Sequence, residues 1–293
     1  MVHSSILYND QIRESASRVL SPGQIGLLSG WGVFSTIRIV DGVLFAWERH
    51  WARMQHDAKL LRVPFPNDSE AVRRSLLRLV EANQAQTATL RIVVVRNRGG
   101  IWEGPGLDRD YDLIALTTKL KDWGEGTRLA VVPQARHSAQ MFAGVKSLSW
   151  SMNLCWYEMA QSRGYDEALL LNEHGKVSEC TSANVFVAVG NRVYTPPLGS
   201  GCLPGVTRDV LLSGARVPGI VVEEKDLSLE DLESADEVFI TSTTRNLLSV
   251  LAIEGMEVRQ RGDVRRRVSE AFSEFVRKYV EANRGASGAS QPS

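Results

Sequence analysis

The chain has 293 residues with 34 basic and 34 acidic side chains, so its formal net charge is zero. This balance argues against a dedicated nucleic-acid-binding protein, which needs an excess of basic residues to displace counterions. Hydrophobic residues make up 43% of the chain, which excludes an acidic disordered protein and suffices for one large domain or two modest ones.

In chain order, the first part of the sequence predicts two strands, two helices and two more strands, at 32–40, 43–46, 47–61, 67–82, 88–96 and 111–118. Asp41-Gly42 favours a hairpin turn between the first two strands. Apolar residues at three- and four-residue steps favour the first helix. Asn67 with Glu70 resembles a capping box at the start of the second. Residues 1–119 therefore look like a small α+β domain.

Residues 120–127 are polar, include two glycines and are predicted to be an interdomain linker. The larger domain, 128–284, is predicted to contain strands at 128–133, 166–172, 184–189, 193–195, 237–242 and 248–253, and helices at 149–163, 206–216, 228–233 and 264–283. Single helices and tight turns at Gly175 and Gly190 both join these strands, which indicates a mixed sheet or barrel. The small, polar residues 285–293 are expected to form a disordered tail.

The cysteines and histidines are too widely spaced for a metal site. Cys155, Cys180 and Cys202 form no CxxC pair, and an odd number at these spacings fits reduced thiols in a cytoplasm. No apolar run approaches the roughly 20 residues that cross a bilayer, and the first residues lack the features of a signal peptide. We therefore expect a cytoplasmic protein that binds no metal, membrane or nucleic acid.

Lys146 lies between small and apolar residues, in Gly144-Val145-Lys146-Ser147-Leu148, just before a predicted helix. Desolvation lowers the pKa of a lysine, and an uncharged amine can form a Schiff base with a carbonyl group. A lone lysine is more often a surface charge. However, few lysines compete for such chemistry, because the chain has them only at 59, 119, 121, 146, 176, 225 and 278.

Three later segments carry polar groups that suit a ligand with both a protonated nitrogen and an anionic group. Glu179 stands among small residues before a strand, where it either caps a turn or, if buried, needs a partner such as a protonated pyridine nitrogen. The Pro-Gly turn before Val206 and Thr207 leads into a helix whose first N–H groups would bind an anion. The strand at 237–242 ends in a row of hydroxyl groups.

Taken together, these segments resemble the fold-type IV pyridoxal-phosphate (PLP) enzymes, also called the class IV aminotransferases. This family includes branched-chain aminotransferases, D-amino acid aminotransferases, (R)-amine transaminases and aminodeoxychorismate lyases. Five motifs occur in the family's order, namely Gly32-Val33-Phe34 with the strand to Arg38, His50-Trp51-Ala52-Arg53-Met54, Lys146, the Glu179 segment with Leu203-Pro204-Gly205-Val206-Thr207-Arg208, and Ser242-Thr243-Thr244.

The resemblance implies a homodimer of two-domain α+β chains, each with a small α+β domain and a larger pseudo-barrel domain, with PLP between them. It implies that Lys146 forms the Schiff base and moves the substrate's α proton, and that Glu179 keeps the pyridine nitrogen protonated. The other implied cofactor contacts are Arg53, Val206, Thr207, Ser242 and Thr243 at the phosphate, and Leu203 on the ring. The implied reaction is a ping-pong exchange of an amino group between an amino acid and a 2-oxo acid.

Substrate preference is less closely specified. The resemblance implies Phe34, Arg38, Arg91, Arg98 and Thr244 as substrate-binding residues, with Thr244 helping to receive a carboxylate. Arg38 and Arg91 match positions of branched-chain aminotransferases. We therefore expect a transaminase for branched-chain L-amino acids. A D-amino acid or (R)-amine transaminase and an aminodeoxychorismate lyase remain alternatives.

Several positions depart from the family pattern. Ser35 replaces the usual glutamate, Trp31 replaces a small or acidic residue, and Trp150-Ser151 stands where branched-chain enzymes have a tyrosine. The segment from Arg96 to Trp102 lacks the histidine that D-amino acid enzymes use to trap a carboxylate. A protein that binds the cofactor without turnover is a different possibility, and the intact Lys146 motif argues against it.

Overall fold

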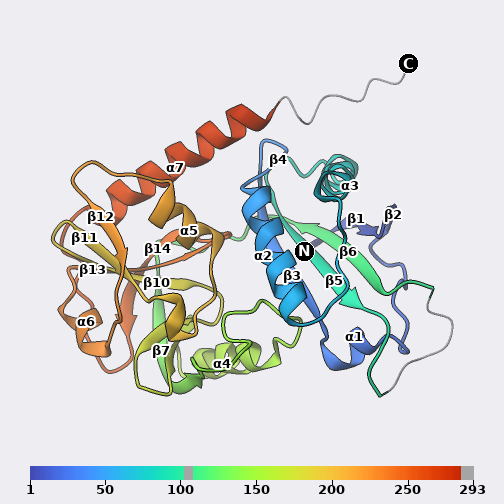
Figure 1. The fold of residues 1–293 in the computed structure, drawn as a ribbon. Coiled ribbons are helices and arrows are strands. Elements are labelled where there is room, and N and C mark those ends of the chain that lie inside the picture. The colour runs from blue at the N-terminus through green and yellow to red at the C-terminus, as the bar shows by residue number, and fades with distance from the viewer. Residues whose placement is uncertain (102–107, 285–293) are drawn as a thin grey trace. The chain divides into compact units, whose positions relative to one another are not determined.

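The computed structural model describes residues 1–101 and 108–284, and it divides the chain into two compact units (Figure 1). Unit 1 comprises Met1–Lys121, Lys146–Trp150 and the segment from Val276, and unit 2 comprises Asp122–Val145 and Ser151–Phe275. The predicted tail, 285–293, and Trp102 lie outside the described residues.

Unit 1 is built on a six-stranded sheet in the order β2-β1-β6-β5-β3-β4, in which every neighbouring pair is antiparallel. Its elements are β1 (Val2–Tyr8), β2 (Gln11–Glu14), α1 (Ile25–Ser29), β3 (Gly32–Val40), β4 (Val43–Leu44), α2 (Trp47–Leu60), α3 (Ser69–Ala82), β5 (Ala88–Arg96) and β6 (Tyr111–Thr118). The final helix, α7 (Val264–Asn283), begins in unit 2 and ends in unit 1.

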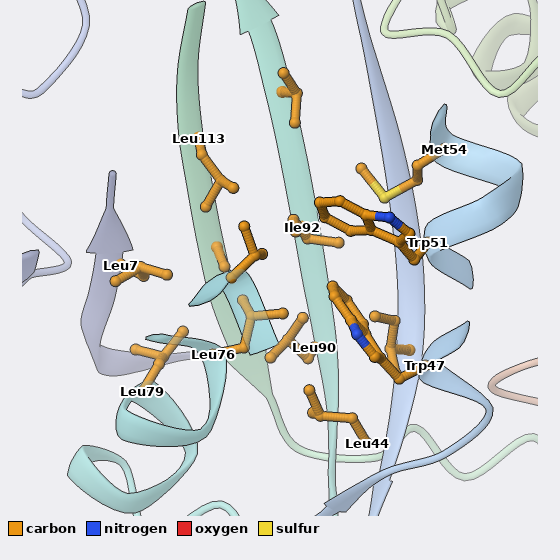
Figure 2. Packing of buried hydrophobic residues seen from close by; sticks show 14 of the residues in the cluster. Leu7, Leu44, Trp47, Trp51, Met54, Leu76, Leu79, Leu90, Ile92 and Leu113 are labelled. Carbon is orange, nitrogen blue, oxygen red and sulfur yellow. The ribbon is translucent and has the colours of Figure 1, made fainter. Parts of the chain in front are cut away.

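The core of unit 1 lies between one face of this sheet and the helices α2 and α3 (Figure 2). Trp47, Trp51 and Met54 of α2 pack against strand residues such as Leu90 and Ile92. Successive side chains of a strand point to opposite faces, so Phe34, Thr36 and Arg38 of β3 lie on the face away from these helices. Strand β3 therefore presents Val33, Ile37 and Ile39 to the core, with Ser35 among them, and a mixed row to the other side.

Unit 2 contains an eight-stranded mixed sheet in the order β12-β11-β10-β13-β14-β7-β8-β9. Its elements are β7 (Gly126–Arg136), α4 (Ser151–Ser162), β8 (Glu167–Asn172), β9 (Val177–Cys180), β10 (Asn184–Val189), β11 (Arg192–Thr195), η1 (Leu198–Ser200), α5 (Val206–Ser213), β12 (Val221–Glu224), α6 (Leu229–Ser234), β13 (Glu237–Ser242) and β14 (Asn246–Ile253). Three neighbouring pairs are parallel, β11 with β12, β14 with β7, and β7 with β8. A large apolar cluster lies on one face of the sheet, and α4 covers part of the other.

The predicted α+β fold with a mixed second sheet is confirmed. The predicted bounds of β3, β5, β6, β10, β13 and α7 match the structure. The predicted capping box at Asn67 is wrong, because the N-cap of α3 is Asp68, whose carboxylate accepts the Ala71 N–H. The strands β1, β2, β9 and β12 and the short helix α1 were not predicted. β9, for example, is a segment of only four residues, Val177-Ser178-Glu179-Cys180, that becomes a strand because it pairs with the buried strand β8.

Candidate functional site

Lys146 belongs to a short segment that extends the sheet of unit 1 along the free edge of β3. The Phe34 N–H donates to the Lys146 carbonyl at 3.2 Å, and the Leu148 N–H donates to the Gly32 carbonyl at 2.9 Å. Val33 and Ser147 form the intervening antiparallel bridge. A Cβ at Gly32 would lie 2.5 Å from the backbone carbonyl oxygen of Val94 on β5 and 2.6 Å from the Leu148 side chain, so the close packing at this position requires glycine. The lysine is thus fixed to β3 through the main chain of its segment.

The side chain of Lys146 lies beside two aromatic rings on the face away from α2 and α3. Its Nζ is 4.6 Å from the centroid of the Phe34 ring and 6.0 Å from that of Trp150. These two rings meet edge to face, with their centroids 6.2 Å apart. Rings in this arrangement limit the directions from which water and substrate reach the amine.

Two arginines on the same face accompany the lysine. The Arg91 guanidinium carbon lies 4.1 Å from the centroid of the Phe34 ring. Arg91 pairs with Thr36 and Arg38 with Thr89 across β3 and β5, which places both arginines on the face that carries Phe34. Burial lowers the pKa of each arginine, but a guanidinium stays protonated at neutral pH. This face therefore offers positive charge next to an apolar ring.

Arg98 has a different environment. Its side chain is 46% exposed and lies 3.7 Å from the Asp110 carboxylate. An acidic partner and wide exposure distinguish it from Arg38 and Arg91. Its predicted role in substrate binding stays a prediction.

Arg53 lies on α2, on the helix side of β3, within a buried polar group. One guanidinium nitrogen donates to the Ser35 hydroxyl at 2.8 Å, and the same hydroxyl lies 2.8 Å from His50 Nδ1. Burial lowers the pKa of Arg53 to about 10, and the charge of Asp57 acts in the opposite direction. Arg53 thus remains a cation. Burial, helped by Arg53 and Lys146, holds the pKa of His50 well below 6.5, so the imidazole is neutral.

The departures from the family pattern have local structural roles. Ser35 is fully buried and links Arg53 to His50. The Trp31 indole N–H donates to the Leu61 carbonyl at 2.7 Å, which joins the start of β3 to the end of α2. Trp150 packs against Phe34, as described above.

In unit 2, the predicted pyridine partner Glu179 is a nearly buried carboxylate held by two donors. Arg136 Nε donates to one of its oxygens at 2.9 Å, and the Leu203 N–H donates to the other at 3.0 Å. A terminal nitrogen of Arg136 also donates to Asn153 at 3.2 Å, which fixes the guanidinium. A carboxylate held in this way has a defined direction and keeps lone pairs for a further donor.

The segment from Leu203 to Thr207 forms the predicted turn and helix start. Asn184 donates its amide N–H to the Leu203 carbonyl at 2.9 Å. A Cβ at Gly205 would collide with the Asn184 side chain, so any larger residue here would displace Asn184 from its hydrogen bond to Leu203. Gly205 is the N-cap of α5 and supplies no side-chain cap, while Val206 and Thr207 begin the helix and are buried. The start of α5 therefore suits an anion.

The hydroxyl row after β13 forms a compact turn. The Ser242 hydroxyl accepts the Arg245 N–H at 3.1 Å and lies 3.4 Å from the Thr244 hydroxyl. Thr243 and Thr244 are half-buried. Arg245 is buried, pairs with Glu167 at 2.8 Å and stacks on Trp123. The arginine that follows the row therefore holds the turn in place.

The structure thus places the candidates in two groups. Unit 1 holds Phe34, Arg38, Arg53, Arg91, Arg98 and Lys146, and unit 2 holds Glu179, Leu203, Val206, Thr207, Ser242, Thr243 and Thr244. Five residues that contact these candidates or stabilise their turns were not predicted from the sequence, namely Asp57, Arg136, Asn153, Glu167 and Arg245. Only Asp57 could have been predicted from the sequence, because it lies one helical turn after Arg53 and therefore on the same face of the predicted helix.

Comparison with known proteins identifies the family. Residues 32–253 match the family model of amino-transferase class IV. The chain belongs to this family. It is 33% identical over 87% of its length to a Methanocaldococcus jannaschii protein provisionally named a branched-chain-amino-acid aminotransferase, of which 90% is covered. It is 30% identical over 86% of its length to the D-alanine aminotransferase of Bacillus licheniformis, of which 89% is covered.

Solved structures agree with this assignment. The branched-chain amino acid aminotransferase of Escherichia coli superposes with a TM-score of 0.85 at 25% identity, over 94% of this chain and 95% of that one. A second branched-chain amino acid aminotransferase, solved with pyridoxamine 5′-phosphate, gives a TM-score of 0.85 at 23% identity, over 95% and 97% of the two chains. The expectation of a class IV aminotransferase of fold type IV is confirmed. The chain is therefore an enzyme of the class IV aminotransferase family.

Within residues 1–101 and 108–284, no cluster of three or more histidine, cysteine or acidic side chains could hold a metal ion. In the same residues, no helix combines the length and apolar character needed to span a membrane.

Proposed function

We propose that this aminotransferase uses PLP and a ping-pong Schiff-base mechanism, with a branched-chain L-amino acid as the best amino donor. The observation that carries the proposal is the placement of Lys146, whose main chain is fixed on the edge of β3 while its Nζ lies beside the Phe34 ring. A reactive amine must be held in a defined direction to act repeatedly on a bound carbonyl.

The chemistry of the available donors fits PLP. Its aldehyde needs an amine, its phosphate needs a cation and N–H donors, and a protonated ring nitrogen needs a carboxylate. Lys146 would supply the first and Glu179 the last. Arg53 would bind the phosphate together with the start of α5 at Val206 and Thr207, assisted by the Ser242 and Thr243 hydroxyls. Leu203 would pack on the ring.

When bound, PLP supplies an electron sink for the bonding electrons of a substrate's α carbon. The residues of the chain do the remaining work. Lys146 would hold the cofactor between turnovers and carry the α proton once substrate displaces it. Glu179, oriented by Arg136, would keep the ring nitrogen protonated. Thr244 would help receive the substrate carboxylate.

The test of cofactor use is spectroscopic. Purified protein mixed with PLP should become yellow, and Lys146→Ala should lose the visible band and the covalent attachment. A colourless wild-type protein that gains no visible band with added PLP would refute the proposal.

The proposed donor class rests on the face that carries Phe34. Phe34 and Trp150 offer apolar surface to an aliphatic side chain, while Arg38 and Arg91 offer charge to a carboxylate, including that of an acidic 2-oxo acceptor. Arg98 is a further candidate. The similarity to a D-alanine aminotransferase favours a D-amino acid donor as the second possibility.

One panel of donors separates these possibilities. L-Leucine should be the best substrate, ahead of D-alanine, (R)-1-phenylethylamine and aminodeoxychorismate. A preference for D-alanine or for the (R)-amine would overturn the branched-chain assignment. Pyruvate released from aminodeoxychorismate without an amino acceptor would instead indicate a lyase.

We also propose a homodimer, on the basis of α4. Only Ala160 of this helix is buried, whereas Met152 is 57% exposed, Leu154 50% and Met159 37%. Apolar side chains gathered on an exposed helix indicate a contact surface. Sedimentation should give twice the chain mass, and Leu154→Asp should shift the protein towards monomer. A wild-type protein that sediments as a monomer at micromolar concentration would refute the proposal.

The three cysteines are free, with Cys180 and Cys202 buried and Cys155 exposed. Burial raises the pKa of the Cys202 thiol to about 11, which makes it a poor nucleophile. Free thiols of this kind support a cytoplasmic location as part of the proposal.

A further inference from the structure

Asp57 forms a link between α2 and the lysine segment that the chemistry described so far does not use. Its Oδ2 accepts the backbone N–H of Lys146 at 3.1 Å. The carbonyl of the same lysine accepts the Phe34 N–H at 3.2 Å. The two peptide groups that flank the Lys146 Cα are therefore held from opposite sides, by a helix and by a strand.

The surroundings of the Asp57 carboxylate disfavour its charged form. Asp57 is only 1% exposed and lies in the last part of α2, towards the negative end of the helix dipole. Burial raises the pKa of Asp57, while the Lys146 N–H and the charges of Arg53, His56 and Lys146 act in the opposite direction. A buried carboxylate is retained where its hydrogen bonds and charge do something that an apolar residue does not.

The position of Arg53 indicates what the buried Asp57 carboxylate contributes. Arg53 and Asp57 are four residues apart on α2, which separates their Cα atoms by about 6 Å along a rigid helix. The first is the proposed phosphate contact, and the second holds the main chain of the proposed Schiff-base lysine. One helix therefore sets the spacing between the two points at which the cofactor is attached.

We propose that Asp57 is a positioning residue for Lys146, which fixes the lysine main chain relative to Arg53 by accepting its N–H. This inference rests on the proposed use of PLP. It predicts that loss of the acceptor impairs the bond between Lys146 and the cofactor while leaving the phosphate contact intact.

The first test needs no cofactor. In the unloaded protein, Asp57→Ala should increase hydrogen exchange at the Lys146 amide by about tenfold or more, because a hydrogen bond to a charged group is lost. Asp57→Asn retains an oxygen acceptor, so hydrogen exchange at the Lys146 amide should increase by only about threefold. Unchanged exchange at this amide in Asp57→Ala would overturn the proposal.

The second test compares two ligands. PLP joins its aldehyde carbon to Nζ with release of water, and borohydride then supplies the hydride that makes the bond permanent for mass spectrometry of the Lys146 peptide. Pyridoxine 5′-phosphate has the same ring and phosphate but an alcohol instead of the aldehyde. Asp57→Ala should lower the equilibrium yield of the bond by about tenfold, because the amine is misplaced. The Kd for pyridoxine 5′-phosphate should stay within about twofold, because Arg53 is unchanged.

Two comparisons complete the design. Glu48→Gln is a matched control, because Glu48 also lies on α2 but accepts a hydrogen bond from Tyr279 instead of the lysine segment. This variant should change neither the yield of the covalent bond with PLP nor the Kd for pyridoxine 5′-phosphate. If Asp57→Ala weakens the binding of pyridoxine 5′-phosphate as much as it lowers the yield of the covalent bond, the damage is general and the proposal is overturned. An equal fall in the yield of the covalent bond in Asp57→Asn and Asp57→Ala would also overturn it. Absence of the covalent bond in wild type would instead refute the use of PLP.

Discussion

Arg245→Met should destabilise unit 2 by about 3–5 kcal/mol, because it leaves the Glu167 carboxylate buried without its cation. The two side chains are 3% and 1% exposed and lie 2.8 Å apart. Glu167 also accepts hydrogen bonds from the Ser182 hydroxyl at 2.8 Å, the Thr181 hydroxyl and the Ala168 N–H. This group of residues joins the turn after Glu179 to the turn that carries Thr243 and Thr244.

The magnitude follows from what is removed. Methionine replaces the stem of the arginine but supplies neither the charge nor the donors to the Ser182 hydroxyl and carbonyl. For a unit of this size, each kcal/mol shifts the melting temperature by roughly 2–4 °C, so a fall of about 10 °C is expected. Adding Glu167→Gln to the variant should restore part of the loss, because the uncompensated charge disappears.

The assay is urea unfolding followed by circular dichroism, with calorimetry for the melting temperature. Arg128→Met is the matched control, because Arg128 pairs with Asp166 at 3.3 Å but both side chains are about half exposed. It should lower the free energy of unfolding by at most about 1 kcal/mol. If Arg245→Met is no more destabilising than this control, the reasoning from burial is refuted.

Three other changes should have specific effects. Tyr279→Phe should lower the free energy of unfolding by about 1 kcal/mol in urea titrations, because the hydroxyl accepts the first N–H of α2, at Trp47, and the N-cap residue of the helix supplies no side-chain hydrogen bond. Wild-type stability should fall as the pH drops below about 6.5, because the unfolded chain takes up a proton that buried His50 does not, and His50→Asn should lessen this fall. A fall of the same size in both proteins would contradict the assignment to His50. Gly205→Ala should weaken PLP binding by about tenfold in a spectroscopic titration, because its Cβ displaces Asn184; unchanged binding would contradict this.

The sequence was sufficient for elements whose pattern is local. The hairpin at Asp41-Gly42, the amphipathic helix α2 and the long helix α7 were predicted from residues within a few positions of one another. The short strand β9 was missed because its four residues form a strand only through pairing with β8. Local propensity carries little information about such pairing.

The same distinction holds for the site. Lys146, Glu179 and Arg53 were predicted as site residues because each stands in a motif that can be recognised from its neighbours in the sequence. The residues that hold them are distant in sequence, since Asp57 is 89 positions from Lys146 and Arg136 is 43 from Glu179. No periodicity or spacing links such pairs, and only the folded chain brings them together.

Ser35 shows how a departure that is visible in the sequence gains its meaning from the structure. The family's usual glutamate at this position would place a second carboxylate beside Arg53. Here a neutral hydroxyl accepts from Arg53 and contacts the neutral His50, so it adds no charge. The carboxylate whose charge raises the pKa of Arg53 is that of Asp57, which also accepts the N–H of Lys146. In this chain the carboxylate that lies near the proposed phosphate cation also holds the lysine main chain, so substitution of Asp57 should impair attachment of the cofactor to Lys146 more than it impairs the phosphate contact of Arg53.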